Sequence, residues 1–168
     1  MPCAPAQRGS ENDEAQPRPV TLSHDHHQAL FIAQKLRRAI ADTAGDARSA
    51  FVAYWDAHGR GHFRLEEEIL LPAYASHGDT HHPLVARALC DHVAIRARAD
   101  ALAQDQAPDP AVLHELGTCL ADHVRLEERA LFPLIEAALP AERLAAVAIA
   151  LDLAERGTGS GRAGGTAE

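Results

Sequence analysis

Aromatic residues are scarce in this sequence. Phe, Trp and Tyr make up only 4% of its 168 residues, although apolar residues as a whole make up 46%. Alanine and leucine supply most of the apolar content, which favours helices. Alternating runs rich in Val, Ile and Tyr are lacking, so we expect no strands. The composition therefore predicts an all-α domain.

Long apolar runs and an excess of positive charge are also lacking. No run reaches the roughly 18 residues that a bilayer-spanning helix needs, and the first residues do not form the apolar stretch of a signal peptide. The net charge of −8 argues against nucleic acid, which is bound by basic surfaces. We therefore expect a cytoplasmic protein that binds neither membranes nor nucleic acid.

Cysteine is rare, whereas histidine is abundant. The three cysteines, Cys3, Cys90 and Cys119, are odd in number and widely spaced, so they predict no disulfide framework. The eleven histidines are scattered through the chain. Histidine at that density in a helical chain indicates metal binding.

The chain divides into three parts by composition. Residues 1–20 are rich in Pro, Gln, Gly and charge, and residues 157–168 are rich in Gly, so both ends are predicted to be disordered. Residues 21–156 carry apolar stretches of helical period between Gly- and Pro-containing breaks. These stretches predict one helical domain.

Four long helices and a short fifth one are expected in that domain. Their predicted ranges are about 24–43, 47–75, 83–104, 110–138 and 141–155. Ser23 is the predicted N-cap of the first helix, Gly45 is predicted to break it, and Pro110 is predicted to open the fourth. Long helices with short connections favour an up-down-up-down four-helix bundle.

One line of sequence is written twice. HFRLEEEILLP, residues 62–72, and HVRLEERALFP, residues 123–133, align without a gap and share His, Arg, Leu, two Glu, Leu and Pro. An Asp-His pair occurs in the preceding helix each time, as Asp25-His26 and as Asp91-His92. The repeat unit is therefore a pair of helices, used twice.

Helical geometry predicts which of the repeated side chains face inward. At about 100° per residue, Glu66 lies about 40° from His62 on the apolar face. Glu67, Glu68 and Glu128 are expected to point toward water. The same test, applied to all four long helices, gives an inward set of one His from each helix and one Glu from each copy of the line: His26, His62, Glu66, His92, His123 and Glu127.

Two His–Glu pairs in a core have a different meaning from one pair on a surface. A single pair four residues apart is more often a surface ion pair. Two ionised carboxylates inside a bundle, however, need cations. Imidazole and carboxylate suit iron, zinc or manganese, and two carboxylates among four imidazoles favour a pair of bridged ions. The Glu-x-x-His and His-Glu-x-x-His patterns of other metal proteins do not occur.

The chain from about Ser23 to Leu139 resembles the hemerythrin-like (HHE cation-binding) family. The resemblance rests on the two copies of the repeated line together with DHHQAL and DHVAIR. The resemblance implies a four-helix bundle around a non-haem di-iron centre with an oxo or hydroxo bridge. One iron would take His26 and His62, the other would take His92 and His123, and Glu66 and Glu127 would bridge both. Family members bind dioxygen, and some branches serve nitric oxide or peroxide responses, iron sensing or repair of iron centres.

The sequence departs from the oxygen carriers of that family at one position. Carriers have a second His one turn beyond the third-helix ligand, where this chain has Arg96, and arginine cannot ligate a metal. One ligand fewer favours a centre that reacts, senses or exchanges ligands. His58 and Tyr54 are candidates for an extra ligand. Tyr54 could equally be a core aromatic residue, and His58 a partly exposed imidazole.

Three functions are consistent with these observations. The first is a di-iron protein that binds dioxygen, nitric oxide or peroxide for sensing or stress response. The second is a di-iron enzyme or iron donor that acts on peroxide or nitric oxide or in iron-centre repair. The third is a structural bundle that binds zinc. The sequence names neither an electron donor nor an oligomeric state.

Overall fold

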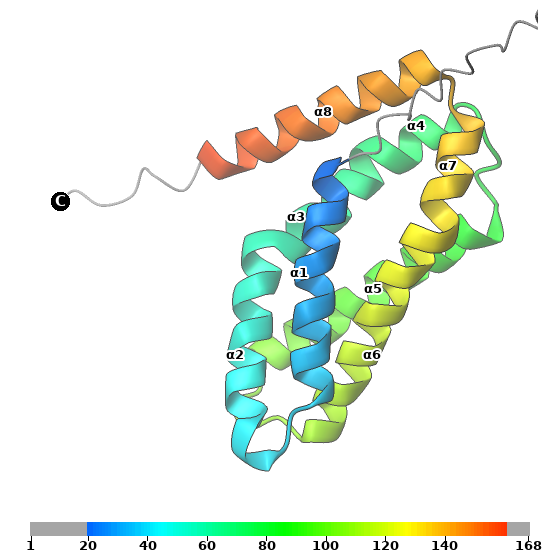
Figure 1. Ribbon diagram of the computed structural model, residues 1–168. Coiled ribbons are helices and arrows are strands. Elements are labelled where there is room, and N and C mark those ends of the chain that lie inside the picture. Colours follow the sequence, from blue (N-terminus) through cyan, green and yellow to red (C-terminus); the bar gives the residue numbers. More distant parts are fainter. Residues whose placement is uncertain (1–19, 161–168) are drawn as a thin grey trace, which may run out of the picture.

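The computed structural model of the protein describes residues 20–160, and side chains within residues 25–156. In that part of the chain all regular elements are helical and no strand occurs, which confirms the all-α fold (Figure 1). Residues 1–19 of the predicted arm and residues 161–168 of the predicted tail lie outside the described residues.

The helices follow one another with short connections. Their bounds are α1 (Val20–Arg37), α2 (Ala44–Tyr54), α3 (Arg60–Leu65), α4 (Leu71–Ala75), α5 (Pro83–Gln104), α6 (Pro110–Leu126), α7 (Phe132–Ala138) and α8 (Ala141–Ser160). Wider, π-helical turns join some of them without a break: η2 (Trp55–Gly59) and η3 (Glu66–Leu70) link α2, α3 and α4, and η4 (Glu127–Leu131) links α6 and α7.

Four rods close into a bundle. The first is α1, the second runs from α2 to α4, the third is α5, and the fourth runs from α6 to α7. α1 packs against α2 and along α6, and α5 packs against α2 and α6, so the four rods enclose a common interior (Figure 1). This arrangement confirms the predicted bundle. Within residues 20–160, no helix has the length and apolarity that a membrane crossing requires.

The fifth helix is longer than predicted. α8 runs to Ser160 and so includes the first residues of the predicted tail. It lies across one end of the bundle, where it contacts α3 and η3 (Figure 1). Leu144, Val147 and Leu151 bury their side chains there.

The ends of the first helix differ from the prediction. α1 begins at Val20, so Ser23 lies inside it and is not its N-cap, and α1 ends at Arg37. Ile40 then adopts an extended backbone (φ −119°, ψ 173°), and its N–H donates to Oγ1 of Thr43 over 3.0 Å. Because this local hydrogen bond competes with the helical one, the chain turns here, and Gly45 lies within α2 instead of breaking the first helix.

The third and fourth rods begin where proline predicts. Pro83 and Pro110 occupy the first helical positions of α5 and α6, as the sequence indicates for Pro110. His82 accepts a hydrogen bond from the N–H of Leu84 over 3.2 Å, and Asp109 accepts one from the N–H of Ala111 over 2.9 Å. These two side chains cap otherwise unpaired N–H groups.

The repeated line contains a repeated irregularity in the backbone. The N–H of Leu71 donates to the carbonyl of Glu66, and that of Phe132 to the carbonyl of Glu127, each five residues back. Pro72 and Pro133 follow directly; proline has no N–H and crowds the carbonyl four residues before it. The α-helical ladder is therefore interrupted in both copies at the inward glutamate.

The bundle interior has two apolar clusters separated by a polar layer. One cluster includes Phe51, Trp55 and Leu113, and the other includes Leu70, Leu131 and Leu151. In the second and fourth rods, Glu66 and Glu127 lie between residues of the two clusters, and in the third rod His92 does. The fold therefore places its buried titratable groups at one level.

Gly117 allows a close approach between α1 and α6. A Cβ atom at this position would lie 2.7 Å from the carbonyl oxygen of Ala33 and 2.9 Å from Cβ of Leu36, both on α1. We expect Gly117→Val to lower the free energy of unfolding by about 2 kcal/mol, because α1 must shift outward. Urea denaturation measures this change.

A matched control lies in α3. A Cβ atom at Gly61 would meet nothing within 4 Å, so Gly61→Ala should stabilise the protein by up to about 1 kcal/mol through helix propensity. Equal midpoints for the two variants would contradict this account of the α1–α6 contact.

Candidate metal centre

The six side chains predicted to face inward come together in the polar layer. Their exposed fractions are 1% for His26, 5% for His62, 2% for Glu66, 1% for His92, 0% for His123 and 0% for Glu127. They form two groups of four that share both glutamates: His26 and His62 complete one group, and His92 and His123 complete the other. Within each group, the ligand atoms lie within 4.8 Å of one another.

The first group gathers nitrogen and oxygen atoms at close spacing. Nε2 of His26 lies 3.1 Å from Nε2 of His62 and 3.2 Å from Oε2 of Glu127. Nε2 of His62 lies 3.3 Å from Oε1 of Glu66. A spacing of about 3 Å is expected for neighbouring ligands at right angles around an ion with bonds of about 2.1 Å.

The second group uses the other oxygen of each glutamate. Nε2 of His92 lies 3.1 Å from Oε2 of Glu66 and 3.5 Å from Oε1 of Glu127. Nε2 of His123 lies 2.8 Å from Oε1 of Glu127. Each carboxylate therefore offers one oxygen to each group, which is the arrangement of a bridging ligand.

A second set of carboxylates contacts the outer nitrogens of the histidines. Nδ1 of His26 lies 3.2 Å from Glu128, Nδ1 of His92 lies 2.8 Å from Glu67, and Nδ1 of His62 lies 3.5 Å from Asp25. A carboxylate at Nδ1 holds the proton on that nitrogen and leaves the lone pair on Nε2. The hydrogen bonds at Nδ1 of His26 and His92 therefore direct the Nε2 lone pairs of these rings into the layer, whereas His62 has only the longer ion-pair contact with Asp25.

The expectation that Glu67 points toward water is wrong, and Glu128, although 39% exposed at its side chain, also reaches a histidine. Both residues lie in the π-helical turns, where each residue rotates less about the axis than in an α-helix. Glu68 is exposed and pairs with Arg64, as expected. The signal for the outer carboxylates was present in the sequence, because Glu-Glu and Asp-His both occur in each repeat.

Arg96, which cannot ligate a metal, supports His92 through Glu67. Its guanidinium donates to both oxygens of Glu67 over 2.6 and 3.0 Å. It also lies 5.6 Å from the ring centre of Phe63, which stacks on His92 at 3.9 Å. Arg96 thus holds Glu67, and Glu67 holds His92.

Several buried polar atoms in the layer lack a hydrogen-bond partner among the described residues. They include both carboxylate oxygens of Glu66 and Glu127 and Nε2 of His92 and His123. These atoms are close to one another but do not form well-aligned hydrogen bonds, because they point toward common positions. Buried carboxylates without hydrogen bonds are costly unless a cation joins them. The nitrogen and oxygen donors fit iron, zinc or manganese.

The electrostatics of the layer also favour a cation. Burial alone would lower the pKa of the two imidazoles that face Glu66, but the surrounding carboxylates raise it to about 10 for His62 and about 9 for His92. Burial would raise the pKa of Glu127, but contacts with imidazoles, His123 first, hold it well below its usual range. Without an ion, the layer therefore retains protons as its positive charge.

The two candidates for an extra ligand lie in different surroundings. Tyr54 is buried, and its hydroxyl pKa is raised by burial and then by the charges of Asp25, Glu127 and Glu66. His58 is exposed and stacks on the ring of Tyr54 at 6.3 Å. Tyr54 therefore lies beside the layer, and His58 belongs to neither group of four.

A helical bundle that buries four imidazoles around two shared carboxylates has the donor groups to hold cations. A family model, the hemerythrin HHE cation-binding domain, matches residues 18–135. The chain belongs to this family, and the resemblance noted in its sequence is confirmed. Searches of curated proteins and of solved structures find no significant match.

The raised pKa values predict how pH affects the metal-free protein. The folded chain keeps protons on His62 and His92 up to about pH 10 and about pH 9, whereas the unfolded chain releases them near 6.5. Their contribution to stability is therefore complete below pH 6.5 and is lost as the pH rises through 9 to 10. The free energy of unfolding should fall by roughly 1 kcal/mol per pH unit for each retained proton.

Urea denaturation between pH 6.5 and 10, with a chelator present, measures this fall. The metal-loaded protein provides the control, because its imidazoles are already deprotonated and its stability should not fall in the same range. A metal-free protein of constant stability across this range would contradict the proposed protonation of the layer.

Proposed function

We propose that the protein holds two iron ions and binds dioxygen, or a related small ligand such as nitric oxide or peroxide, for sensing or stress response. The observation that carries this proposal is the pair of donor groups that share Glu66 and Glu127. Each group uses one oxygen of each carboxylate. Membership of the hemerythrin HHE family supports iron as the metal. The shared carboxylates support two ions over one.

Each residue of the layer has a proposed role. His26 and His62 hold the first ion, and His92 and His123 hold the second. Glu66 and Glu127 would serve both ions, together with an oxo or hydroxo group. When bound, a ferrous pair would supply electrons and open positions for a small ligand.

The protein surroundings would keep the centre ordered and dry. Phe132 stacks on His26 at 5.4 Å, and Phe63 contacts both His92 and His123, stacked on the first ring and edge-on to the second. These rings cover the imidazoles with apolar surface, which excludes water. The outer carboxylates fix the orientation of the rings they contact.

The number of protein ligands favours a centre that exchanges ligands. Each group has four protein donors, and Arg96 is engaged with Glu67 instead of completing the second group. Tyr54 is the stronger candidate for an extra ligand, because it is buried beside the layer, whereas His58 is exposed. Open positions also suit the alternative function of an enzyme or iron donor that acts on peroxide or nitric oxide.

Metal content and the optical spectrum test the proposal. We expect about two irons per chain and an absorption band of a bridged ferric pair, which bleaches on reduction and returns in air. Zinc without such a band would contradict the di-iron proposal and favour a structural zinc bundle. Turnover of peroxide or nitric oxide by the ferrous protein would favour the enzyme.

Two histidine variants test the roles of the residues. His62→Ala should remove most of the bound metal, because it deletes a buried donor of the first group. His114→Ala is the control: His114 donates to the carbonyl of Ala39 over 2.7 Å, away from the layer, so iron content should not change. Equal iron in the two folded variants, measured by elemental analysis, would refute the assignment.

A further inference from the structure

The aspartates of the two repeats make different contacts. In the first repeat, Asp25 precedes His26 and contacts Nδ1 of His62 on the paired helix. In the second repeat, Asp91 precedes His92, and the histidine on the paired helix is His123. The duplication therefore predicts a contact between Asp91 and Nδ1 of His123.

Asp91 is bound elsewhere. Nε of Arg87 donates to both of its carboxylate oxygens, over 2.9 and 3.0 Å. Nδ1 of His123 is buried and has no hydrogen-bond partner among the described residues. His123 is thus the one imidazole of the four without an outer carboxylate in the described part of the chain.

The sequence explains why the repeats differ. Arg87 lies four residues before Asp91, and the residue four positions before Asp25 is Thr21, which carries no charge. A residue four positions earlier lies on the same helix face and can pair with the aspartate. The second repeat therefore has an arginine four residues before the aspartate, and the first repeat has none at that spacing.

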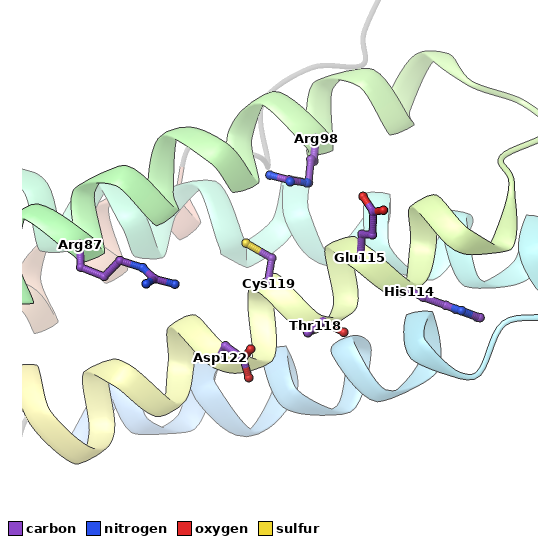
Figure 2. A pocket seen from close by; sticks show the side chains of 7 residues that line it. All are labelled: Arg87, Arg98, His114, Glu115, Thr118, Cys119 and Asp122. Atoms are coloured by element: carbon purple, nitrogen blue, oxygen red, sulfur yellow. The ribbon is translucent and has the colours of Figure 1, made fainter.

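Arg87 occupies an accessible place. Its side chain is 64% exposed and lines an open groove between α5 and α6, together with Cys119, Asp122 and Arg98 (Figure 2). Asp91, by contrast, is only 9% exposed. The ion pair thus joins a surface side chain to a carboxylate beside the polar layer.

We propose that Arg87 is a positioning residue that withholds Asp91 from His123 and so makes the second metal position the weaker one. The inference rests on the proposed two-metal function. A carboxylate at Nδ1 orients an imidazole and raises its basicity, and loss of such a partner weakens metal binding about 10- to 100-fold. In the first group, Glu128 contacts Nδ1 of His26, and Asp25 lies 3.5 Å from Nδ1 of His62 as an ion-pair partner without a hydrogen bond. In the second group, only His92 has a carboxylate at Nδ1 among the described residues. The two ions therefore bind in order, with the second ion more readily exchanged.

Zn²⁺ titration of the metal-free protein against a chromophoric chelator tests the proposal. Arg87→Gln should free Asp91 and tighten binding of the second ion about tenfold, with the first ion unchanged. The gain should disappear in the double variant Arg87→Gln/Asp91→Asn. Asp91→Asn alone should bind both ions like the wild type, because Asp91 does not serve His123 there.

Arg98→Gln is the matched control. Arg98 lines the same groove on the same helix, but its guanidinium contacts the carbonyl of Ala94 over 3.4 Å and not Asp91. This variant removes one positive charge and should leave both affinities unchanged. A gain equal to that of Arg87→Gln would overturn the proposal, because it would mark a general effect of charge.

Nitrogen-15 spectra of the zinc-loaded histidine rings give a readout that simple destabilisation would not move. In Arg87→Gln, the Nδ1 proton of His123 should shift downfield and exchange more slowly with water. The proposal about Arg87 would be overturned if Arg87→Gln had wild-type affinities and spectra, or if Asp91→Asn bound the second ion tenfold more weakly. Neither result would affect the proposed function. A wild-type protein that binds no second ion would overturn the proposed function as well.

Discussion

The structure depends on the neutralisation of two buried carboxylates. Glu66 and Glu127 lie between two apolar clusters, at a level where neither water nor well-aligned hydrogen bonds satisfy them within the described residues. Opposite charge must therefore come from protons on the imidazoles or from bound cations. The four histidines provide for both cases, because the same Nε2 atoms can hold a proton or a metal.

The internal duplication explains how a short chain builds this layer. Each helix pair contributes the same kinds of group, and the π-helical turn at each inward glutamate brings the next glutamate back toward a histidine of another rod. The proline that closes each copy of the repeated line interrupts the helical ladder at the same place. The repeated line thus supplies both an inner and an outer carboxylate in each repeat.

Sequence reasoning succeeded where a signal was periodic or duplicated. The four rods, the helix start at Pro110 and the six side chains of the layer all follow from such signals. It failed where local contacts override the average helix: Thr43 ends the first rod by bonding Ile40, and the π-helical turn redirects Glu67. Sequence reasoning also missed the pairing of Asp91 with Arg87, although the spacing of four residues indicates it, because the duplication predicts that the two repeats make the same contacts.

The division of the interior into two apolar clusters has a consequence for cooperativity. α8 buries Leu144, Val147 and Leu151 in only one of the clusters, while the polar layer separates that cluster from the other. Without cations, the two halves are coupled through a layer whose contacts depend on protonated imidazoles, so the end of the bundle under α8 would open more readily once those protons are lost. A bridged pair of ions would fasten all four rods at one level and join the two halves into a single folding unit.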